Sequence, residues 1–370
     1  MKRLVGILIL LLLLNFLPIN ADAQTDVYTA GACLIEASTG RVLYEKNADK
    51  RLPMASTTKV MTALLTLENC SLDEMVKIDD RAVGVEGSSM YLGYGETLCM
   101  RDLMYGLMLT SGNDAAVAIA IHVAGDVESF VELMNTKAVQ IGCQNTNFVT
   151  PNGLHNDNHY SSARDMALIG AYAMQMPEFR EIVSTNYHQT TTGNTDRTLK
   201  NKNRLLWEYE GGNGVKTGYT TKSGKCLVFA AKRDGMQVVG AVLSCPDMWN
   251  AAKSIMDYGF ENYEMAALVD AETTSFFVPV KNSEKKHLAV SPEHSILYPI
   301  KINGDDNVNI THQTVEYTQA PVMAGSIMGS ISAQVNGEYV GTYDLIAVES
   351  AQEYDLMYYL SQIFFGWLSA

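Results

Sequence analysis

The sequence predicts an α/β (α+β) fold, in which an antiparallel sheet with flanking helices and a helical subdomain precedes a small all-β domain and an amphipathic C-terminal helix. Three observations favour this architecture. β-Prone segments at 32–45 and 214–243 enclose a long stretch of helical character. Beyond residue 275, short β-prone runs alternate with turns. The last residues place apolar side chains on one face of a helix.

The N-terminus has the pattern of a secretory signal peptide, which we assign to residues 1–23. Lys2 and Arg3 precede an apolar run at 4–17, and Ala21-Asp22-Ala23 is a small-x-small cleavage pattern. The core of the apolar run is too short for a comfortable membrane span. We therefore exclude this segment from the fold and expect an exported, extracytoplasmic protein.

Charge and composition limit the possible partners. The formal net charge of −14 becomes −15 without the signal segment, because Lys2, Arg3 and Asp22 together contribute +1. So acidic a chain is a poor candidate for binding nucleic acid or for purely electrostatic docking on anionic lipid. The 47% of hydrophobic residues argues against disorder. The six cysteines contain no C-x-x-C pair, so disulfides and free buried thiols stay open alternatives.

The first folded domain is expected at 24–262, and its first half contains a hairpin followed by helices. Segments 32–37 and 41–45 flank a Ser-Thr-Gly turn and predict the hairpin. A buried helix begins at Ser56, and a loop at 87–92 separates it from helices at 101–109 and 114–123. Asp126 is expected to cap another helix, which Gly142 stops. The inward-facing residues of this last helix are predicted to be Phe130, Leu133, Met134 and Ile141.

The second half of this domain alternates between loop, helix and sheet. A loop at 145–162, with the turn Thr150-Pro151-Asn152-Gly153, precedes a helix at 163–174 and a polar, Thr-rich stretch at 187–203. Three strands follow, and Asp234-Gly235 is a good hairpin signal between the last two. The strands are expected at 214–220, 225–231 and 236–243, and a helix at 251–258 ends at Gly259.

Residues 275–348 predict a separate small all-β domain, and residues 349–370 form a terminal segment. The pattern at 354–368 predicts an amphipathic helix with aromatic side chains on its apolar face, which suits a membrane interface. That face consists of Leu356, Leu360, Ile363, Phe364 and Trp367. The alternative is a helix docked on its own protein. Because the polar face carries no Lys or Arg, membrane binding would depend on burial of apolar side chains alone.

Ser56 and Lys59 are the first candidate catalytic residues, in an S-x-x-K pattern at the start of a buried helix. Positions i and i+3 share a helix face, so the hydroxyl and the amine would be neighbours. A serine is a weak nucleophile until a base takes its proton. Lysine can be that base if burial or a second cation lowers its pKa.

Two further motifs follow in order. Ser111-Gly112-Asn113 lies in a loop between two predicted helices, where its side chains can face a cleft. Lys216-Thr217-Gly218 lies on a predicted strand, and Gly218 would let a substrate backbone approach that strand closely.

The ordered set S-x-x-K, S-x-N and K-T-G, on helix, loop and strand, resembles the active-site signature of the penicillin-recognising serine enzymes. Within that group the chain is similar to the D-Ala-D-Ala carboxypeptidases, the low-molecular-mass penicillin-binding proteins, from about Tyr28 to the C-terminus. The resemblance implies a β-lactamase/transpeptidase-like fold for the serine D,D-peptidase domain at 24–262. It also rests on the looser motifs Gly87-Ser88-Ser89-Met90, Asn152-Gly153-Leu154, Arg164-Asp165-Met166-Ala167, Asn203-Arg204-Leu205-Leu206 and Asp257-Tyr258-Gly259-Phe260.

The resemblance implies a role for each site residue. Ser56 would attack the penultimate D-Ala carbonyl of a peptidoglycan stem peptide, with Lys59 as its base and Ser111 as the relay to the departing amine. Asn113 would bind the substrate and help to fix Lys59. Lys216 and Thr217 would bind the terminal carboxylate, and the N–H groups of Ser56 and Tyr219 would form the oxyanion hole. The catalytic residues would thus be Ser56, Lys59 and Ser111, and the substrate-binding residues Asn113, Lys216, Thr217, Gly218 and Tyr219.

The same resemblance implies partners and a location. β-Lactams would acylate Ser56 in the same way. They would act as inhibitors because the reaction would stop at the acyl-enzyme. The protein would attach peripherally to the outer face of the cytoplasmic membrane through its C-terminal helix. The chain departs from many relatives at Met248, where they carry a basic residue thought to help hold the substrate carboxylate.

Three related activities were weighed against this one. A class A β-lactamase would carry a glutamate in an E-x-x-L-N loop between the second and third motifs, and no such loop stands between Ser111 and Lys216. A D,D-endopeptidase uses the same residues and stays open. A penicillin-sensing or wall-binding protein with little activity is argued against by the intact nucleophile, base and K-T-G, and faintly favoured by Met248.

A zinc hydrolase is a fourth alternative, because His155 and His159 are four residues apart. They lie in a loop rich in Gly and Asn, without an H-E-x-x-H helix, and are expected to be surface histidines. His122 is expected to be a core residue. We therefore expect neither a metal nor a cofactor.

Overall fold

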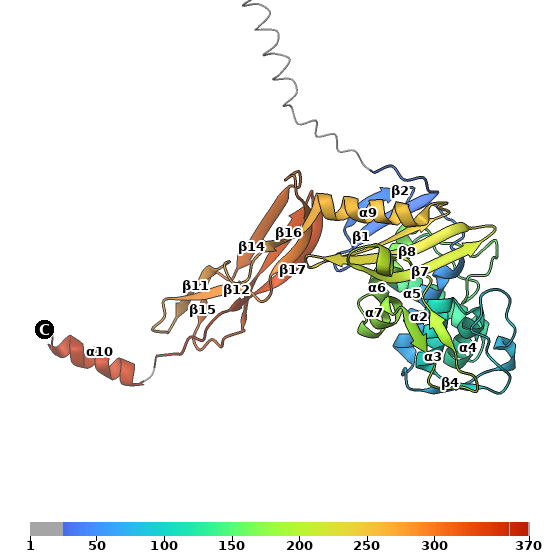
Figure 1. The fold of residues 1–370 in the computed structure, drawn as a ribbon. Helices are drawn as coiled ribbons and strands as arrows, with labels where there is room; N and C mark the ends of the chain where they lie inside the picture. Colours follow the sequence, from blue (N-terminus) through green and yellow to red (C-terminus); the bar gives the residue numbers. More distant parts are fainter. Residues whose placement is uncertain (1–24, 355, 369–370) are drawn as a thin grey trace, which may run out of the picture.

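The computed structural model describes residues 25–354 and 356–368. Figure 1 shows a larger N-terminal body, a slender β domain that extends from one side of it, and the helix α10 (Leu356–Leu368) at the far end. The predicted signal peptide at 1–23 lies outside the described residues. Within the described ranges, no helix combines the length and the apolar character that crossing a membrane requires.

A five-stranded antiparallel sheet forms the centre of the large body, in the order β2-β1-β9-β8-β7. Its strands are β1 (Gly31–Glu36), β2 (Val42–Lys46), β7 (Gly212–Thr220), β8 (Gly224–Arg233) and β9 (Met236–Leu243). Both predicted hairpins, β1–β2 and β8–β9, are present. Because β9 pairs with β1, strands from the two ends of the domain meet, and the helical segment between them is a long insertion.

Helices cover both faces of this sheet, so its strands alternate between two apolar cores. Ile35 and Val228 face the larger core around α2, whereas Leu34 and Leu227 face the core under α9. The larger core is built from η1 (Ala55–Thr58), α2 (Lys59–Asn69), α4 (Asn113–Ala124), α5 (Val127–Ile141), α6 (Ala163–Ala173) and α7 (Pro177–Ser184). On the other face, α9 (Met248–Asn262) packs against β8 and β9.

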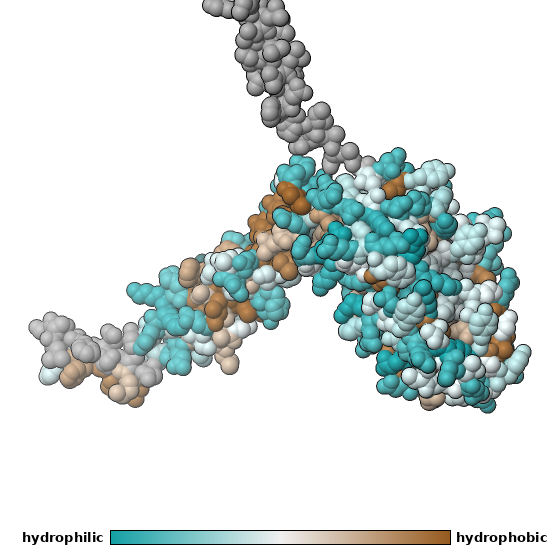
Figure 2. Space-filling model, in the orientation of Figure 1, coloured by the Kyte–Doolittle hydropathy of each residue, from teal (hydrophilic) through white to brown (hydrophobic). Residues whose placement is uncertain are grey.

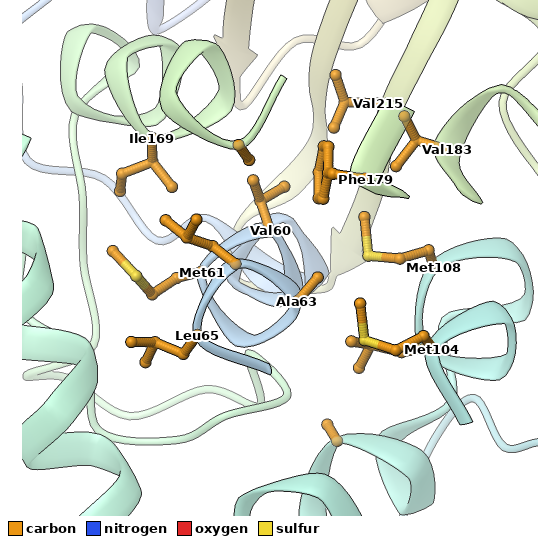
Figure 3. Packing of buried hydrophobic residues seen from close by; sticks show 14 of the residues in the cluster. Val60, Met61, Ala63, Leu65, Met104, Met108, Ile169, Phe179, Val183 and Val215 are labelled. Atoms are coloured by element: carbon orange, nitrogen blue, oxygen red, sulfur yellow. The ribbon is translucent and has the colours of Figure 1, made fainter. Parts of the chain in front are cut away.

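Helix α2 lies inside the larger core rather than on its surface. Figure 3 shows Val60, Met61, Ala63 and Leu65 pointing from α2 in several directions. Their apolar neighbours come from separate elements: Met104 and Met108, Ile169, Phe179, Val183 and Val215. All residues of α2 from Lys59 to Thr66 are buried, so packing on every side fixes the position of the helix.

Shorter elements complete the large body, including a helix at the predicted position 101–109, which is part α and part π. They are β3 (Met75–Lys77), η2 (Asp80–Ala82), β4 (Thr97–Cys99), α3 (Met100–Tyr105), the π-helix η3 (Gly106–Thr110), β5 (Tyr187–Gln189), β6 (Thr198–Lys200) and α8 (Leu205–Glu208). The six cysteines, all within the described residues, are free thiols.

Three details of the sequence prediction were wrong. Gly259 does not end the helix that contains it. It lies inside α9, where a Cβ would approach Leu34 Cδ2 to 2.6 Å, so glycine allows close packing on the sheet. Leu133 is 39% exposed because it lies off the inward stripe of Phe130 and Met134. Helix α7 was not predicted.

The β domain contains two sheets. The two-stranded sheet pairs β10 (Tyr263–Val269) with β13 (Ile296–Lys301), and the six-stranded sheet has the order β14-β16-β17-β12-β11-β15. Its strands are β11 (Phe276–Lys281), β12 (His287–Pro292), β14 (Val308–Thr314), β15 (Thr318–Gln319), β16 (Ile327–Val335) and β17 (Glu338–Ala347). Figure 2 shows brown apolar patches on this domain and on the visible part of α10.

Arg41, in the β1–β2 turn, links the β domain to the large body. Its guanidinium donates to both carboxylate oxygens of Asp306, at 2.7 and 2.9 Å, and to the Pro299 carbonyl. The rings of Tyr263 and Tyr298 lie 5.2 and 5.3 Å from the guanidinium carbon. Both charged side chains are nearly buried, 11% and 3% exposed.

We expect Arg41→Ala to lower the free energy of unfolding by about 3 kcal/mol at neutral pH, because it leaves a buried carboxylate without its partner. Scanning calorimetry measures the effect. Lys285→Ala, which removes an exposed ion pair with Glu349, is the control and should change little. Equal unfolding temperatures for Arg41→Ala and wild type would contradict the prediction.

The same pair predicts a pH dependence. Burial raises the pKa of Asp306, but hydrogen bonds from Arg41, the Lys301 N–H and Asn336 outweigh burial and lower the pKa to about 2. A carboxyl whose pKa is lower in the folded state stabilises above its unfolded pKa of about 3.9 and loses that stabilisation as the pH falls. The unfolding temperatures of the wild type and of Arg41→Ala should therefore converge as the pH falls from about 4 to about 2.

Candidate active site

Ser56 lies in the short 3-10 turn η1 that leads directly into α2. The sequence placed it in the first turn of the helix, and the structure places the tighter turn just before that helix. The Lys59 Nζ atom lies 3.1 Å from the Ser56 Oγ atom. Because α2 is buried, the backbone that carries this pair is held by the core on all sides.

Lys59 is fully buried, and three oxygen atoms lie within hydrogen-bond distance of its amine. Besides Ser56 Oγ, its amine contacts Asn113 Oδ1 at 2.7 Å and the Asn152 carbonyl at 2.6 Å. Burial lowers the pKa of Lys59 well below its usual value, and repulsion from Lys216 and Lys202 lowers it further. The amine is thus disposed to be neutral and to accept a proton from Ser56.

Lys216 and Lys202 complete a cluster of three lysines. Lys216 is buried on β7, donates to the Thr217 carbonyl at 3.0 Å, and has a pKa lowered to about 7 by burial and then by Lys202. Lys202 donates to the Thr110 carbonyl at 2.8 Å, and partial burial lowers its pKa. Lys202 and the partly charged Lys216 give the site a positive potential that suits an anionic substrate group.

The second motif reaches the site from the end of η3. Ser111 is nearly buried and adopts a left-handed backbone with φ 67°, which ends the π-helix and turns the chain into α4. Asn113 begins α4, and its Nδ2 donates to the Glu86 carbonyl at 2.6 Å while its Oδ1 accepts from Lys59. The Asn113 amide is therefore oriented by two partners.

The third motif lies on β7, the edge strand of the sheet. A Cβ on Gly218 would lie 3.1 Å from the backbone nitrogens of Ser56 and Thr57, so only glycine lets β7 approach η1 this closely. Lys225 on β8 is the cross-strand partner of Tyr219. Its backbone carbonyl accepts from the Cys245 N–H, so it points away from β7. The Tyr219 N–H therefore points away from β8, towards the cleft beside Ser56.

These residues surround a cavity of about 460 Å³. It is lined by Ser56, Ser88, Ser111, Lys202, Thr217, Gly218, Tyr219, Lys225, Met248 and Trp249. A larger cavity of about 730 Å³ lies between the two domains, but its lining holds no serine beside a lysine base. The smaller cavity is the candidate site for nucleophilic catalysis.

The structure brings all eight candidate site residues together, and it adds groups that the sequence reasoning missed. The Asn152 carbonyl binds Lys59 as a backbone group, which no side-chain motif reveals. Lys202 and Lys225 are single lysines without a motif. Trp249 is half-buried and lines the cavity beside Met248.

The prediction that His159 lies on the surface was wrong. It is 3% exposed; its Nδ1 accepts from the Val149 N–H, so its Nε2 donates to Thr58 Oγ1 at 2.8 Å. Burial lowers its pKa to about 4, with smaller contributions from His155 and Lys59. His159 thus holds the loop that presents the Asn152 carbonyl against the turn that carries Ser56.

Two other histidines complete the comparison. His155 is exposed, as expected, and pairs with Asp157. His122 is not a core residue, because its Nε2 lies 3.2 Å from Glu74 Oε2 at the surface. Cys70, Glu74 and His122 form a group of three possible metal ligands, whose ligand atoms lie within 4.8 Å of one another. None of the three lines the cavity.

Comparisons with known proteins agree with this geometry. The family described as D-alanyl-D-alanine carboxypeptidase matches residues 19–247. The family described as penicillin-binding protein 5, C-terminal domain, matches residues 263–353.

Individual relatives cover most of the chain. The D-alanyl-D-alanine carboxypeptidase DacF of Bacillus subtilis is 33% identical over 99% of both chains. The D-alanyl-D-alanine carboxypeptidase of Streptomyces sp. strain K15 is 39% identical over 66% of this chain and 91% of its own. The structure of penicillin-binding protein 5 from Haemophilus influenzae is 29% identical, covers 89% of this chain and 98% of its own, and has a TM-score of 0.72.

We expect Lys202→Met to raise the pKa of Lys59, because it removes a cation whose repulsion lowers that pKa. A larger fraction of Lys59 would then be protonated at neutral pH. The pKa is measured from the ¹³Cε shift of Lys59 by NMR. Lys222→Met removes an exposed lysine that does not line the cavity and should leave the pKa unchanged. An unchanged pKa in Lys202→Met would exclude the repulsion.

Proposed function

This chain belongs to the D-alanyl-D-alanine carboxypeptidase family, and on that basis we propose how its residues carry out the reaction. The protein is a serine-type D-Ala-D-Ala carboxypeptidase that removes the terminal D-Ala from peptidoglycan stem pentapeptides and is acylated by β-lactams. The observation that carries the mechanism is the 3.1 Å contact between Ser56 Oγ, which lines the cavity, and Lys59 Nζ, which is buried beneath it.

Acylation begins with transfer of the Ser56 proton to the neutral Lys59 amine. The Ser56 oxygen forms a bond to the carbonyl carbon of the penultimate D-Ala. The N–H groups of Ser56 and Tyr219 stabilise the oxyanion that develops, and each such donor is typically worth about 3 kcal/mol. The buried position of Lys59 supports this role, because a neutral amine needs no prior loss of a proton to act as base.

The leaving D-Ala must gain a proton before its C–N bond breaks. Lys59, now an ammonium, holds the proton taken from Ser56. Ser111 lines the cavity with Ser56 and is the group that relays this proton to the departing amine. Asn113 holds Lys59 through its Oδ1 and binds the substrate.

The terminal carboxylate binds at Thr217 and Lys216. The Thr217 side chain faces the cavity and donates a hydrogen bond, while Lys216 contributes partial positive charge from behind β7. Lys59, neutral again, then takes a proton from the water that attacks the acyl carbonyl. The ester bond breaks, Lys59 returns that proton to the Ser56 oxygen, and the tetrapeptide leaves. A β-lactam follows the same acylation and blocks the second step.

The protein's location is part of the proposal. The pattern at 1–23 favours export by a signal peptide, and the exposed apolar side chains of α10 favour peripheral attachment to the outer face of the cytoplasmic membrane. The exposed side chains that support attachment are Leu356, Met357, Leu360, Ile363, Phe364 and Trp367. The helix is too short to span a bilayer.

Ser56→Ala is expected to lower D-Ala release from an acylated peptide ending in D-Ala-D-Ala by more than about 10³-fold, because no other group replaces the nucleophile. Covalent labelling by fluorescent penicillin should disappear in the same variant. Circular dichroism controls for folding. Persistent labelling of Ser56→Ala would mean that the nucleophile is another residue.

Removing residues 354–370 is expected to move the protein from the membrane pellet to the supernatant, since the apolar face of α10 is lost. D-Ala release in solution should stay at the wild-type rate, because α10 lies at the far end of the β domain (Figure 1). Fractionation followed by penicillin labelling measures both properties. A truncated protein that still pellets would show that another segment is the anchor.

A further inference from the structure

We propose that Lys225 binds the terminal carboxylate of the substrate together with Thr217, and so supplies the exposed cation that the carboxylate side of the cleft otherwise lacks. This inference rests on the proposed function, because it assumes that the cleft takes a peptide with a free C-terminus. It is carried by the position of Lys225 in the sheet and by the composition of the cavity wall.

Lys225, Tyr219 and Thr217 project from the same face of the sheet. Thr217 and Tyr219 are two residues apart on β7, and successive side chains of a strand alternate between faces. Lys225 on β8 is the direct cross-strand partner of Tyr219, so their side chains lie on one face. Thr217 and Lys225 are therefore diagonal neighbours, roughly 7–8 Å apart, a separation that long side chains bridge.

The wall formed by this face is otherwise uncharged. Thr217, Tyr219, Lys225, Met248 and Trp249 all line the cavity. Among them, Lys225 is the one ionisable cation, and Met248 offers only apolar surface. A carboxylate that accepts from the Thr217 hydroxyl would meet no other ammonium on this wall.

Lys225 is available for a ligand. Its Nζ donates to the Pro246 carbonyl at 3.1 Å, and within the described residues no carboxylate lies within ion-pair distance of it. Asp247, the acid next to Pro246, accepts instead from Asn250 at 2.9 Å. A carboxylate can therefore bind Lys225 without breaking an existing ion pair.

Neither of the other two cations supplies a full positive charge on this wall. Lys216 is 1% exposed, and its pKa of about 7 leaves it only partly charged at neutral pH. Lys202 is held by the Thr110 carbonyl, next to Ser111, and so belongs to the wall of the second motif. The cleft therefore divides into a proton-transfer side at Ser111 and a carboxylate side at Thr217 and Lys225.

The test compares Lys225→Met with the wild type and with Lys222→Met, which removes an exposed lysine from the same β7–β8 turn without touching the cavity. Each variant is assayed with an acylated peptide ending in D-Ala-D-Ala. We expect KM for Lys225→Met to rise about two- to fivefold, in the range of a single exposed ion pair, with a smaller change in kcat. Lys222→Met should match the wild type, and Lys225→Arg should restore most of the affinity.

A second measurement distinguishes the effect of the Lys225 charge on the carboxylate from an effect of Lys225 on packing. The C-terminal amide of the same peptide, used as a competitive inhibitor, should bind Lys225→Met and wild type equally. Addition of salt should raise KM for the wild type more than for Lys225→Met. Thermal unfolding of both variants controls for folding.

The outcomes distinguish this inference from the proposed function. If Lys225→Met and Lys222→Met give the same KM as the wild type, the role of Lys225 is overturned while the carboxypeptidase mechanism stands. If the amide loses affinity as much as the acid does, Lys225 contributes packing and the inference fails. If the folded wild type releases no D-Ala at all, both the proposed function and this inference fail.

Discussion

The burial of a single amine, that of Lys59, is the constraint on which the rest of this structure depends. A lysine excluded from water must find acceptors, and this one has a hydroxyl, a side-chain amide and a backbone carbonyl around it. Each acceptor arrives from a different part of the chain. Helix α2 must lie in the core, α4 must begin beside it, and the loop after α5 must fold back against η1. The architecture of the large body satisfies these three requirements at once.

The loop that carries Asn152 shows how far this constraint extends. A carbonyl oxygen fixes Lys59 only if the loop itself cannot move, and His159 supplies that restraint by bonding Val149 on one side and Thr58 on the other. Since burial and the nearby His155 and Lys59 keep this histidine neutral, it bridges loop and turn without adding a positive charge beside the lysine cluster. An apparently remote loop residue therefore contributes to the position of the catalytic amine.

Much of this could be predicted from sequence, for physical reasons. The Ser56–Lys59 contact is local, because residues three apart meet on any helical turn. The strands are apolar, β-prone runs bounded by turns, because a sheet covered on both faces buries nearly every side chain. Groups that act through tertiary position could not be predicted. Asn152 contributes a backbone atom, Lys202 and Lys225 are isolated lysines, and His159 lies in a polar loop that the fold happens to bury. Helix α9 was predicted too short because Gly259 resembles a helix stop, whereas its lack of a side chain serves packing against Leu34.

The placement of the second domain follows from the order of the strands. The cleft lies at β7, one edge of the sheet, whereas Arg41 anchors the β domain through the turn beside β2, the opposite edge. A domain attached at the far edge can hold the body in a defined orientation without covering the cleft. The Arg41–Asp306 pair stabilises that orientation through a nearly buried, bidentate contact between two rings. A cleft left open in this way can receive the end of a peptide that is still attached to a polymer, which a small enclosed cavity could not.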